Sequence, residues 1–128
     1  MRRFLFLSFP FLLSMAEPIK DTRLRIELED REGVRHSLRG LFCNGKDYLK
    51  VREGSVDYSI TFGSISSIEV LGQDPSGLRI RVNSREGTTK EYFLSPNTYC
   101  RASSKLGEAG FYLKDVKTIF IKVEEKAR

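Results

Sequence analysis

LRIELEDREGV (residues 24–34) and LRIRVNSREGT (residues 78–88) are two stretches of the chain that read almost alike. Six of the eleven positions are identical, and the stretches begin 54 residues apart. In both, apolar residues alternate with charged or polar ones before Arg-Glu-Gly, which is the pattern of a half-buried strand that runs into a turn. The pair therefore predicts a strand and a turn that occur twice in this chain.

A second pair of stretches also indicates an internal repeat. Residues 60–70 read ITFGSISSIEV and residues 111–121 read FYLKDVKTIFI, with apolar residues at the same five positions. Their offset is 51 residues, so two matches occur in the same order at nearly the same separation. The alternation changes to a spacing of three from Phe62 to Ile65 to Ile68, which predicts one 3-10 turn between two strands.

The remaining sequence also favours short strands and tight turns. Val34, Leu38 and Phe42 fall on one face of a second strand, and Gly40 marks a bend or bulge in it. Asn44-Gly45 is the strongest hairpin signal in the chain. Further strands are expected over residues 48–52, 56–62, 88–94 and 99–102, a loop over residues 103–110, and side-chain caps of the two 3-10 turns at Ser64 and Asp115.

These patterns predict an all-β fold made of two degenerate repeats of about 50 residues each. The bent strands and the 3-10 turn before a last short strand resemble an SH3-like or Sm-like small barrel. The stretch with Gly33, Gly40 and Leu41 is similar to the first Sm-like motif. The resemblance implies either two small barrels packed together or one pseudo-symmetric sandwich or barrel of eight to ten strands. It is a resemblance of fold and points to no named family.

The N-terminal sequence predicts export. MRRFLFLSFPFLLSMA (residues 1–16) has a basic start, an apolar middle and a small-x-small end, as a secretory signal peptide does. We expect cleavage after Ala16, no membrane span in the remaining chain, and a periplasmic or extracellular location in a bacterium. The predicted division is a signal peptide (1–16), a linker (17–22), two repeats in one compact domain (23–72 and 73–123) and a tail (124–128).

Export affects the expected redox state of the two cysteines. In an oxidising compartment Cys43 and Cys100 are the one possible intrachain pair, and a structural disulfide is the expected role. A reactive thiol has no support, because the sequence holds no Cys-x-x-Cys motif.

No motif for catalysis, a metal or a cofactor occurs in the sequence. The single histidine, His36, falls on the apolar side of its strand, where we expect a core or rim residue. An enzyme is therefore not predicted, and a small hydrolase that uses His36 in a site between the repeats is one alternative. Another alternative is a sensor or carrier of a small ligand, held in an apolar pocket between the repeats.

The outward residues of the strands are the candidate partner-binding residues. Arg25, Arg79 and Arg81 alternate with core residues on the two equivalent first strands, and together they would form a basic patch. Phe93 and Tyr112 also alternate with inward residues and would be exposed. The Sm-like RNA pocket is not matched, so we expect no nucleic acid. The sequence favours a non-catalytic binding or assembly module of the bacterial envelope, with an envelope protein or an anionic surface polymer as partner.

Overall fold

The computed structural model describes residues 24–124, and strands make up nearly all of that range. The strands are β1 (Leu24–Asp30), β2 (Arg35–Cys43), β3 (Tyr48–Glu53), β4 (Val56–Thr61), β5 (Ile65–Asp74), β6 (Gly77–Ser84), β7 (Thr89–Leu94), β8 (Tyr99–Ser104), β9 (Gly107–Tyr112) and β10 (Val116–Val123). Single 3-10 turns, η1 (Phe62–Ser64) and η2 (Leu113–Asp115), precede β5 and β10. The prediction of an all-β fold with two 3-10 turns is confirmed.

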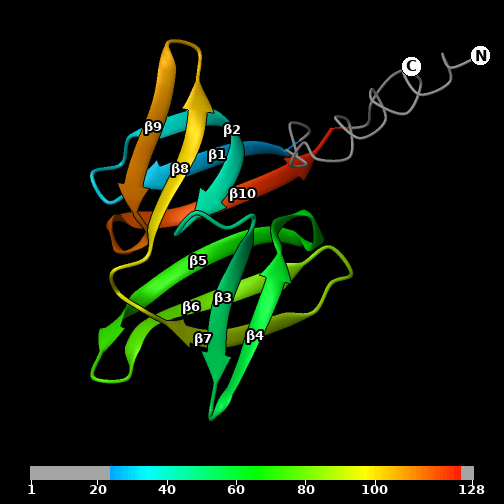
Figure 1. Ribbon diagram of the computed structural model, residues 1–128, viewed down its shortest axis with the longest axis vertical. Coiled ribbons are helices and arrows are strands. Elements are labelled where there is room, and N and C mark those ends of the chain that lie inside the picture. The colour runs from blue at the N-terminus through cyan, green and yellow to red at the C-terminus, as the bar shows by residue number, and fades with distance from the viewer. Residues whose placement is uncertain (1–23, 125–128) are drawn as a thin grey trace, which may run out of the picture.

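The ten strands form one antiparallel sheet in the order β4-β3-β7-β6-β5-β10-β1-β2-β8-β9. The sheet curls at both ends, so that β3 and β4 lie in front of β5, β6 and β7, while β8 and β9 lie in front of β1 (Figure 1). We call strands β3 to β7 the β4 half and strands β1, β2, β8, β9 and β10 the β9 half, after their edge strands. β5 and β10 join the halves at the centre, where Ile68 lies opposite Ile119.

The first and second halves of the sequence are interleaved in this sheet. β3 pairs with β7, and β2 pairs with β8. Two separate barrels, one from residues 23–72 and one from residues 73–123, do not fit this order, because each half of the sheet takes strands from both segments. The structure is one curled sheet of ten strands, which agrees with the predicted strand number of the single sandwich or barrel. The internal repeat itself stays a prediction.

The turn at Asn44-Gly45 forms but does not make an extended hairpin. Both residues have positive φ (52° and 77°), and Cys43 and Lys46 exchange backbone hydrogen bonds of 2.9 and 3.0 Å across them. Beyond that single bridge β2 and β3 separate, because each pairs with a different neighbour. The turn is therefore the point where the chain passes from one half of the sheet to the other.

The predicted bulge at Gly40 is present and changes which residues of β2 face inward. Gly40 has φ +71°, and the register with β8 shifts between Arg39 and Phe42. The shift moves Leu41 into the core at 2% exposure, and Phe42 lies half-buried on the outer face. The prediction that Phe42 shares the inward face of Leu38 is wrong, because a bulge adds a residue and reverses the alternation.

Residues 103–110 are not a loop. They form the tip of a hairpin in which β8 pairs with β9 from Tyr99–Tyr112 to Ser104–Gly107. The hydroxyl of Ser104 donates to the carbonyl of Gly107 at 2.9 Å and closes the turn. The segment holds few apolar residues because β9 is an edge strand, with only Ala109 and Phe111 packed against the core.

The expected caps of the 3-10 turns are also wrong. Thr61 and Tyr112 occupy the N-cap positions, and neither side chain caps the turn. Ser64 instead donates its hydroxyl hydrogen to the carbonyl of Thr61 at 2.8 Å. Each turn is held from outside by an arginine, since Arg85 donates from Nε to the carbonyl of Gly63 at 2.8 Å and Arg31 donates from Nε to that of Lys114 at 3.0 Å.

Candidate functional site

The structure does not gather the predicted arginines into one patch. Arg25 lies on β1 and Arg79 and Arg81 on β6, with β5 and β10 between the two strands. Arg25 pairs with Glu124 at 2.9 Å, and Arg81 pairs with Glu69 at 2.8 Å. These acids neutralise Arg25 and Arg81, so neither contributes a free positive charge to a partner site.

Arg79 and Phe93 do come together. They lie opposite each other on β6 and β7, and Arg52 of β3 lies opposite Phe93 on its other side. Phe93 is half-buried, and Arg52 donates to the carbonyl of Ser76 at 3.0 Å. The result is a short cationic row around one aromatic ring on the outer face of the β4 half.

Tyr112 is exposed as predicted and lies at the end of the edge strand β9, with 43% of its surface accessible. Its ring packs edge-to-face against Tyr99 of β8, with a centroid distance of 4.9 Å. The ammonium of Lys114 lies 5.5 Å from the centre of the same ring. Tyr112 is thus held between an aromatic ring and a cation, and much of it stays open to solvent.

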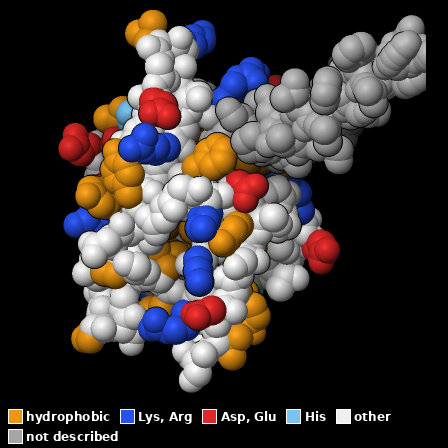
Figure 2. Space-filling view, in the orientation of Figure 1, with side chains coloured by type: hydrophobic (Ala, Val, Ile, Leu, Met, Phe, Trp, Pro, Cys, Tyr) orange, Lys and Arg blue, Asp and Glu red, His pale blue; other side chains and the backbone are white. Residues whose placement is uncertain are grey.

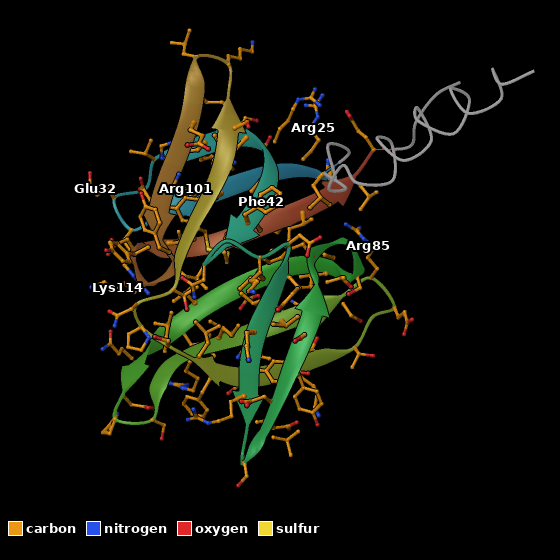
Figure 3. The ribbon with its side chains drawn as sticks, in the orientation of Figure 1. Arg25, Glu32, Phe42, Arg85, Arg101 and Lys114 are labelled. Carbon is orange, nitrogen blue, oxygen red and sulfur yellow. A yellow bond between two sulfur atoms is a disulfide. The ribbon has the colours of Figure 1, made fainter. Side chains whose placement is uncertain are left out.

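Phe42, Tyr99, Arg101 and Tyr112 together form what we call the aromatic face, on the outer side of β2, β8 and β9. Phe42 pairs across the sheet with Arg101, and Tyr99 with Tyr112. Figure 3 places Phe42 and Arg101 on the same side of the molecule, and Figure 2 shows hydrophobic side chains next to Lys or Arg there. A hollow of about 540 Å³ lies on this face, lined by Phe42, Asn44, Gly45, Tyr99, Arg101 and Glu108.

Gly110 gives Tyr99 room to lie flat on β9. A Cβ atom at position 110 would come within 3 Å of the Tyr99 hydroxyl, so the ring occupies the space where a side chain would be. Arg101 lies 5.9 Å from the centre of the Tyr99 ring and contacts Glu108 at 3.3 Å. The absence of a side chain at position 110 thus allows the central ring of the aromatic face to take this position.

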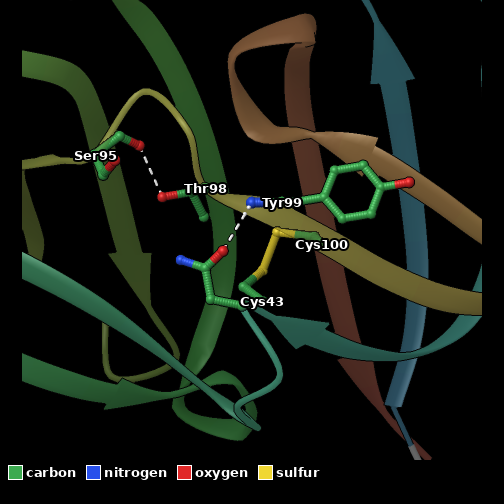
Figure 4. The surroundings of a disulfide bond; sticks show 6 residues. Cys43, Ser95, Thr98, Tyr99 and Cys100 are labelled. Atoms are coloured by element: carbon green, nitrogen blue, oxygen red, sulfur yellow. Dashed lines mark hydrogen bonds between the residues drawn. A yellow bond between two sulfur atoms is a disulfide. The ribbon is translucent and has the colours of Figure 1, made fainter.

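The Cys43–Cys100 disulfide lies directly beneath the aromatic face. The two cysteines are cross-strand partners on β2 and β8, with Cα atoms 4.0 Å apart, and both are buried. Figure 4 shows the disulfide next to Tyr99, whose amide donates to the side-chain oxygen of Asn44 at 3.1 Å. The disulfide and this hydrogen bond therefore join β2 to β8 at the point where Phe42 and Tyr99 project outward.

The sequence pattern predicts Tyr112 but not the other three residues of the face. Simple alternation places Phe42 on the inward side, because it does not account for the bulge at Gly40. Tyr99 and Arg101 alternate with the buried residues Cys100 and Ala102, which is a signal that the strand prediction over residues 99–102 already contained.

β4 forms the other edge of the sheet and borders a second hollow, of about 510 Å³, which we call the β4 groove. Ile60 of β4 and Tyr92 of β7 line its walls, and Val82 of β6 lies between them. Lys90 stands at its rim and pairs with Glu53 at 3.0 Å. The hydrogen bond to Glu53 raises the pKa of Lys90 above its ordinary value, so the ammonium stays charged.

His36 lies on the rim of the β9 half and is exposed. It pairs with Leu28 of β1 across the sheet, and its Nε2 lies 3.1 Å from a carboxylate oxygen of Asp30. The hydrogen bond with His36 is the main cause of a lowered pKa for Asp30, and the amide of Val34 adds to it. Within residues 24–124 this is the one side-chain hydrogen bond of His36, so the structure brings no serine or cysteine to it.

A third hollow, of about 260 Å³, lies between the halves, next to η1. It is lined by Leu24, Leu41, Phe42, Asp47, Thr61, Phe62 and Gly63. Among the residues that the structure covers, no group of three or more His, Cys, Asp or Glu side chains is placed to hold a metal. Residues 24–124 also contain no helix with the length and apolar character needed to cross a membrane.

Comparison with known proteins gives a family and one relative. Residues 20–124 match a family model whose description is "Uncharacterised protein". A protein of Aquifex aeolicus (strain VF5), also described as uncharacterised, is 36% identical over 120 residues, which cover 91% of each chain. No solved structure matches, so the likeness to SH3-like and Sm-like barrels stays a resemblance of sequence pattern.

Proposed function

We propose that this chain, which belongs to the uncharacterised family matched over residues 20–124, is an exported, non-catalytic binding or assembly module of the bacterial envelope. The observation that carries the proposal is Tyr112, an exposed aromatic residue at an edge strand of the sheet. Edge strands take up partners through their free backbone groups, and neighbouring side chains give specificity.

The composition of the aromatic face supports a binding role. Tyrosine and arginine are enriched among the residues that contribute most to protein interfaces. Tyr99 and Tyr112 are held by each other and by the disulfide-linked strands beneath them, so little side-chain entropy is lost on binding. Arg101 is paired with Glu108, so the positive charge beside Tyr112 comes from Lys114, and it suits an acidic partner surface.

Two features support export. Residues 1–16, which lie outside the described range, have the sequence pattern of a signal peptide. The buried Cys43–Cys100 disulfide belongs to the kind of bond that persists in oxidising compartments. The predicted linker at residues 17–22 also lies outside the described range.

We also propose that the chain contains an internal repeat, and this repeat supports an assembly role. In chain order, β1 to β5 of the first repeat correspond to β6 to β10 of the second repeat. When each strand is replaced by its counterpart, the strand order read from β9 to β4 becomes identical to the order read from β4 to β9. Arg31 and Arg85, at equivalent positions of the two stretches, donate to equivalent carbonyls at η2 and η1. A duplicated chain of this kind carries two edge strands of the same origin, β4 and β9.

Photo-crosslinking in the native host tests the proposal. A photoreactive phenylalanine analogue is placed at Tyr112, and in a matched variant at Glu91, on the outer face of β7. We expect a discrete protein adduct from position 112 and none from position 91, in the envelope fraction. No adduct at 112, equal adducts at both positions, or a chain found only in the cytoplasmic fraction would contradict the proposal.

A small-ligand carrier is a second candidate, favoured by the 260 Å³ hollow between the halves. That hollow lies where the alternative requires a pocket, and Leu41 and Phe62 supply buried apolar walls. Extraction of the purified chain with organic solvent, followed by mass spectrometry, tests it. A stoichiometric small molecule would support the carrier, and a chain free of any would contradict it.

A further inference from the structure

In the β4 half, the inward side chains of β3 are buried, whereas those of the neighbouring edge strand β4 are largely exposed. Leu49 and Val51 of β3 are 1% and 2% exposed. Their cross-strand partners on β4, Ile60 and Tyr58, point to the same side of the sheet, yet Tyr58 is 41% exposed and Ile60 is only partly buried. Val56, next in the same row, is 52% exposed. Burial is therefore lost within one strand spacing, at the edge of the sheet.

The β4 groove lies beside this uncovered row. Its floor is apolar, with Ile65 and Val82 at 0% and 5% exposure, and its wall toward β7 is Tyr92, which packs edge-to-face on Tyr58 at 5.9 Å. Ser64, Ser84, Thr88, Arg85, Glu86 and Lys90 supply polar groups around it. The groove thus joins an apolar floor to a polar rim, as a site for a chain with alternating apolar and polar residues does.

The backbone of β4 provides the second element of a binding site. Within residues 24–124 β4 pairs with β3 alone, so the outer row of its amides and carbonyls has no strand partner. Natural edge strands are protected by charged side chains, Lys above all, by Pro or by β-bulges. The sequence VDYSIT has no Lys and no Pro, its pairing with β3 has no register shift, and its one charged residue is Asp57.

We propose that the β4 groove accepts an extended segment of a partner polypeptide as an eleventh strand beside β4, with an apolar residue at every second position. The segment pairs its backbone with the free edge of β4, while its inward side chains cover Val56, Tyr58 and Ile60 and enter the groove. This site is separate from the aromatic face, so a test of it gives a result that does not depend on the role of Tyr112.

Two other occupants fit the geometry less well. A small apolar molecule fills the groove but leaves the outer backbone groups of β4 unpaired. A second copy of the chain would pair with β4 edge to edge over six residues, or roughly 20 Å. Such a contact buries less surface than a stable interface needs, which is about 800 Å² per partner. A single extended segment contacts the edge and the groove together.

A defined peptide tests the proposal. The probe is a short synthetic peptide of alternating Val and Thr with one Trp at a Val position, because the chain itself contains no Trp and the probe fluorescence is then free of background. We expect saturable binding to the purified chain with a blue shift of the Trp emission. The same peptide N-methylated at alternate amides should not bind, since it cannot pair with β4.

Matched variants locate the site. Val56→Asp and Tyr58→Asp, on the inward row, should weaken binding at least about tenfold, as hot-spot substitutions do, while Ser59→Asp on the outer row should change it less than about twofold. Both inward residues are exposed, so the fold is expected to survive, which circular dichroism checks. Equal binding of the N-methylated probe, equal effects of the three substitutions, or no saturable binding would overturn the proposal. A dimer in light scattering that Val56→Asp disrupts and Ser59→Asp does not would also overturn it, in favour of a second copy.

Discussion

Arg85 holds the 3-10 turn η1 from outside, because its Nε donates to the carbonyl of Gly63 at 2.8 Å. Its Nη2 donates to the carbonyl of Ile121 on β10 at 2.7 Å, and its amide donates to the carbonyl of Ser64 at 3.0 Å. One residue therefore ties the β6–β7 turn to η1 and to a strand of the other half. The arginine of the repeated Arg-Glu-Gly stretch therefore has a structural role at this turn.

Replacement of Arg85 by Lys should destabilise the fold. Arg85 reaches the carbonyls of Gly63 and Ile121 from two separate nitrogens of its rigid guanidinium, whereas the donors of a lysine all lie on one nitrogen and cannot reproduce this geometry. We expect a loss of about 1–2 kcal/mol in the free energy of unfolding, measured by urea titration. Arg35→Lys, at an exposed position of β2, is the control and should cost less than about 0.5 kcal/mol. Equal effects of the two would show that the contacts of Arg85 contribute nothing.

Gly77 and Gly63 should respond differently to replacement by Ala. Gly77 has φ +129°, and a Cβ there would lie 2.7 Å from the carbonyl oxygen of Leu94, which is backbone and cannot move aside. Around Gly63 there is open space. Gly77→Ala should therefore lower the free energy of unfolding by about 1–3 kcal/mol, and Gly63→Ala by much less. Thermal unfolding measures both, and a tolerated Gly77→Ala would contradict the close approach of β6 to Leu94.

The Cys43–Cys100 disulfide should contribute to stability through the unfolded chain. It links residues 57 positions apart, and closing a loop of this length is expected to add about 2–4 kcal/mol. The double variant Cys43→Ala/Cys100→Ala should lose that amount in urea titration without reductant. In the presence of reductant the native chain should approach the stability of the double variant. Equal stability of the two proteins without reductant would contradict the predicted stabilisation by the disulfide.

The pKa of Asp30 depends on His36 and should rise when His36 is removed. The native carboxyl has a pKa below its ordinary value of 3.8, chiefly because of the hydrogen bond with His36. In His36→Ala the pKa of Asp30 should move up toward 3.8, as NMR titration of the side chain measures. Ser37→Ala is the control, since Ser37 donates to Glu27 and not to Asp30. A pKa of Asp30 that stays the same in His36→Ala would contradict the contact.

The sign of the corresponding stability change follows from that lowered pKa. A carboxyl with a depressed native pKa stabilises the fold above its unfolded-state pKa, and the contribution is lost as pH falls through the native value. The loss is therefore confined to the acid range below about pH 3.8. Acid unfolding of His36→Ala should be less steep there.

Sequence patterns predicted most strands because their cause is local. Leu24 and Ile26 alternate with charged residues, and that alternation reports burial of one face. β9 was missed because an edge strand needs few apolar residues, and Gly107 and Gly110 look like a loop. The pairing of β3 with β7 and of β2 with β8 could not be read from local patterns, since it joins segments about 40 and 60 residues apart.

The candidate site was predictable only in part for similar reasons. Tyr112 was found because Phe111 and Leu113 mark the inward face on either side of it. Phe42 was missed because the bulge at Gly40 changes the alternation in a way that depends on pairing with β8. The role of Arg85 was hidden because its acceptors are backbone carbonyls, which carry no sequence signal.

The central claim is that the sheet ends in two open edges, β4 and β9. Amide hydrogen exchange of the purified chain, measured for each residue by NMR, tests this claim most directly. The amides of β4 and β9 that point away from β3 and β8 should exchange on the order of 100-fold faster or more than those of the central strands β5 and β10. Protection of either edge equal to that of β5 and β10 would mean that the edge is already covered, and would contradict the account.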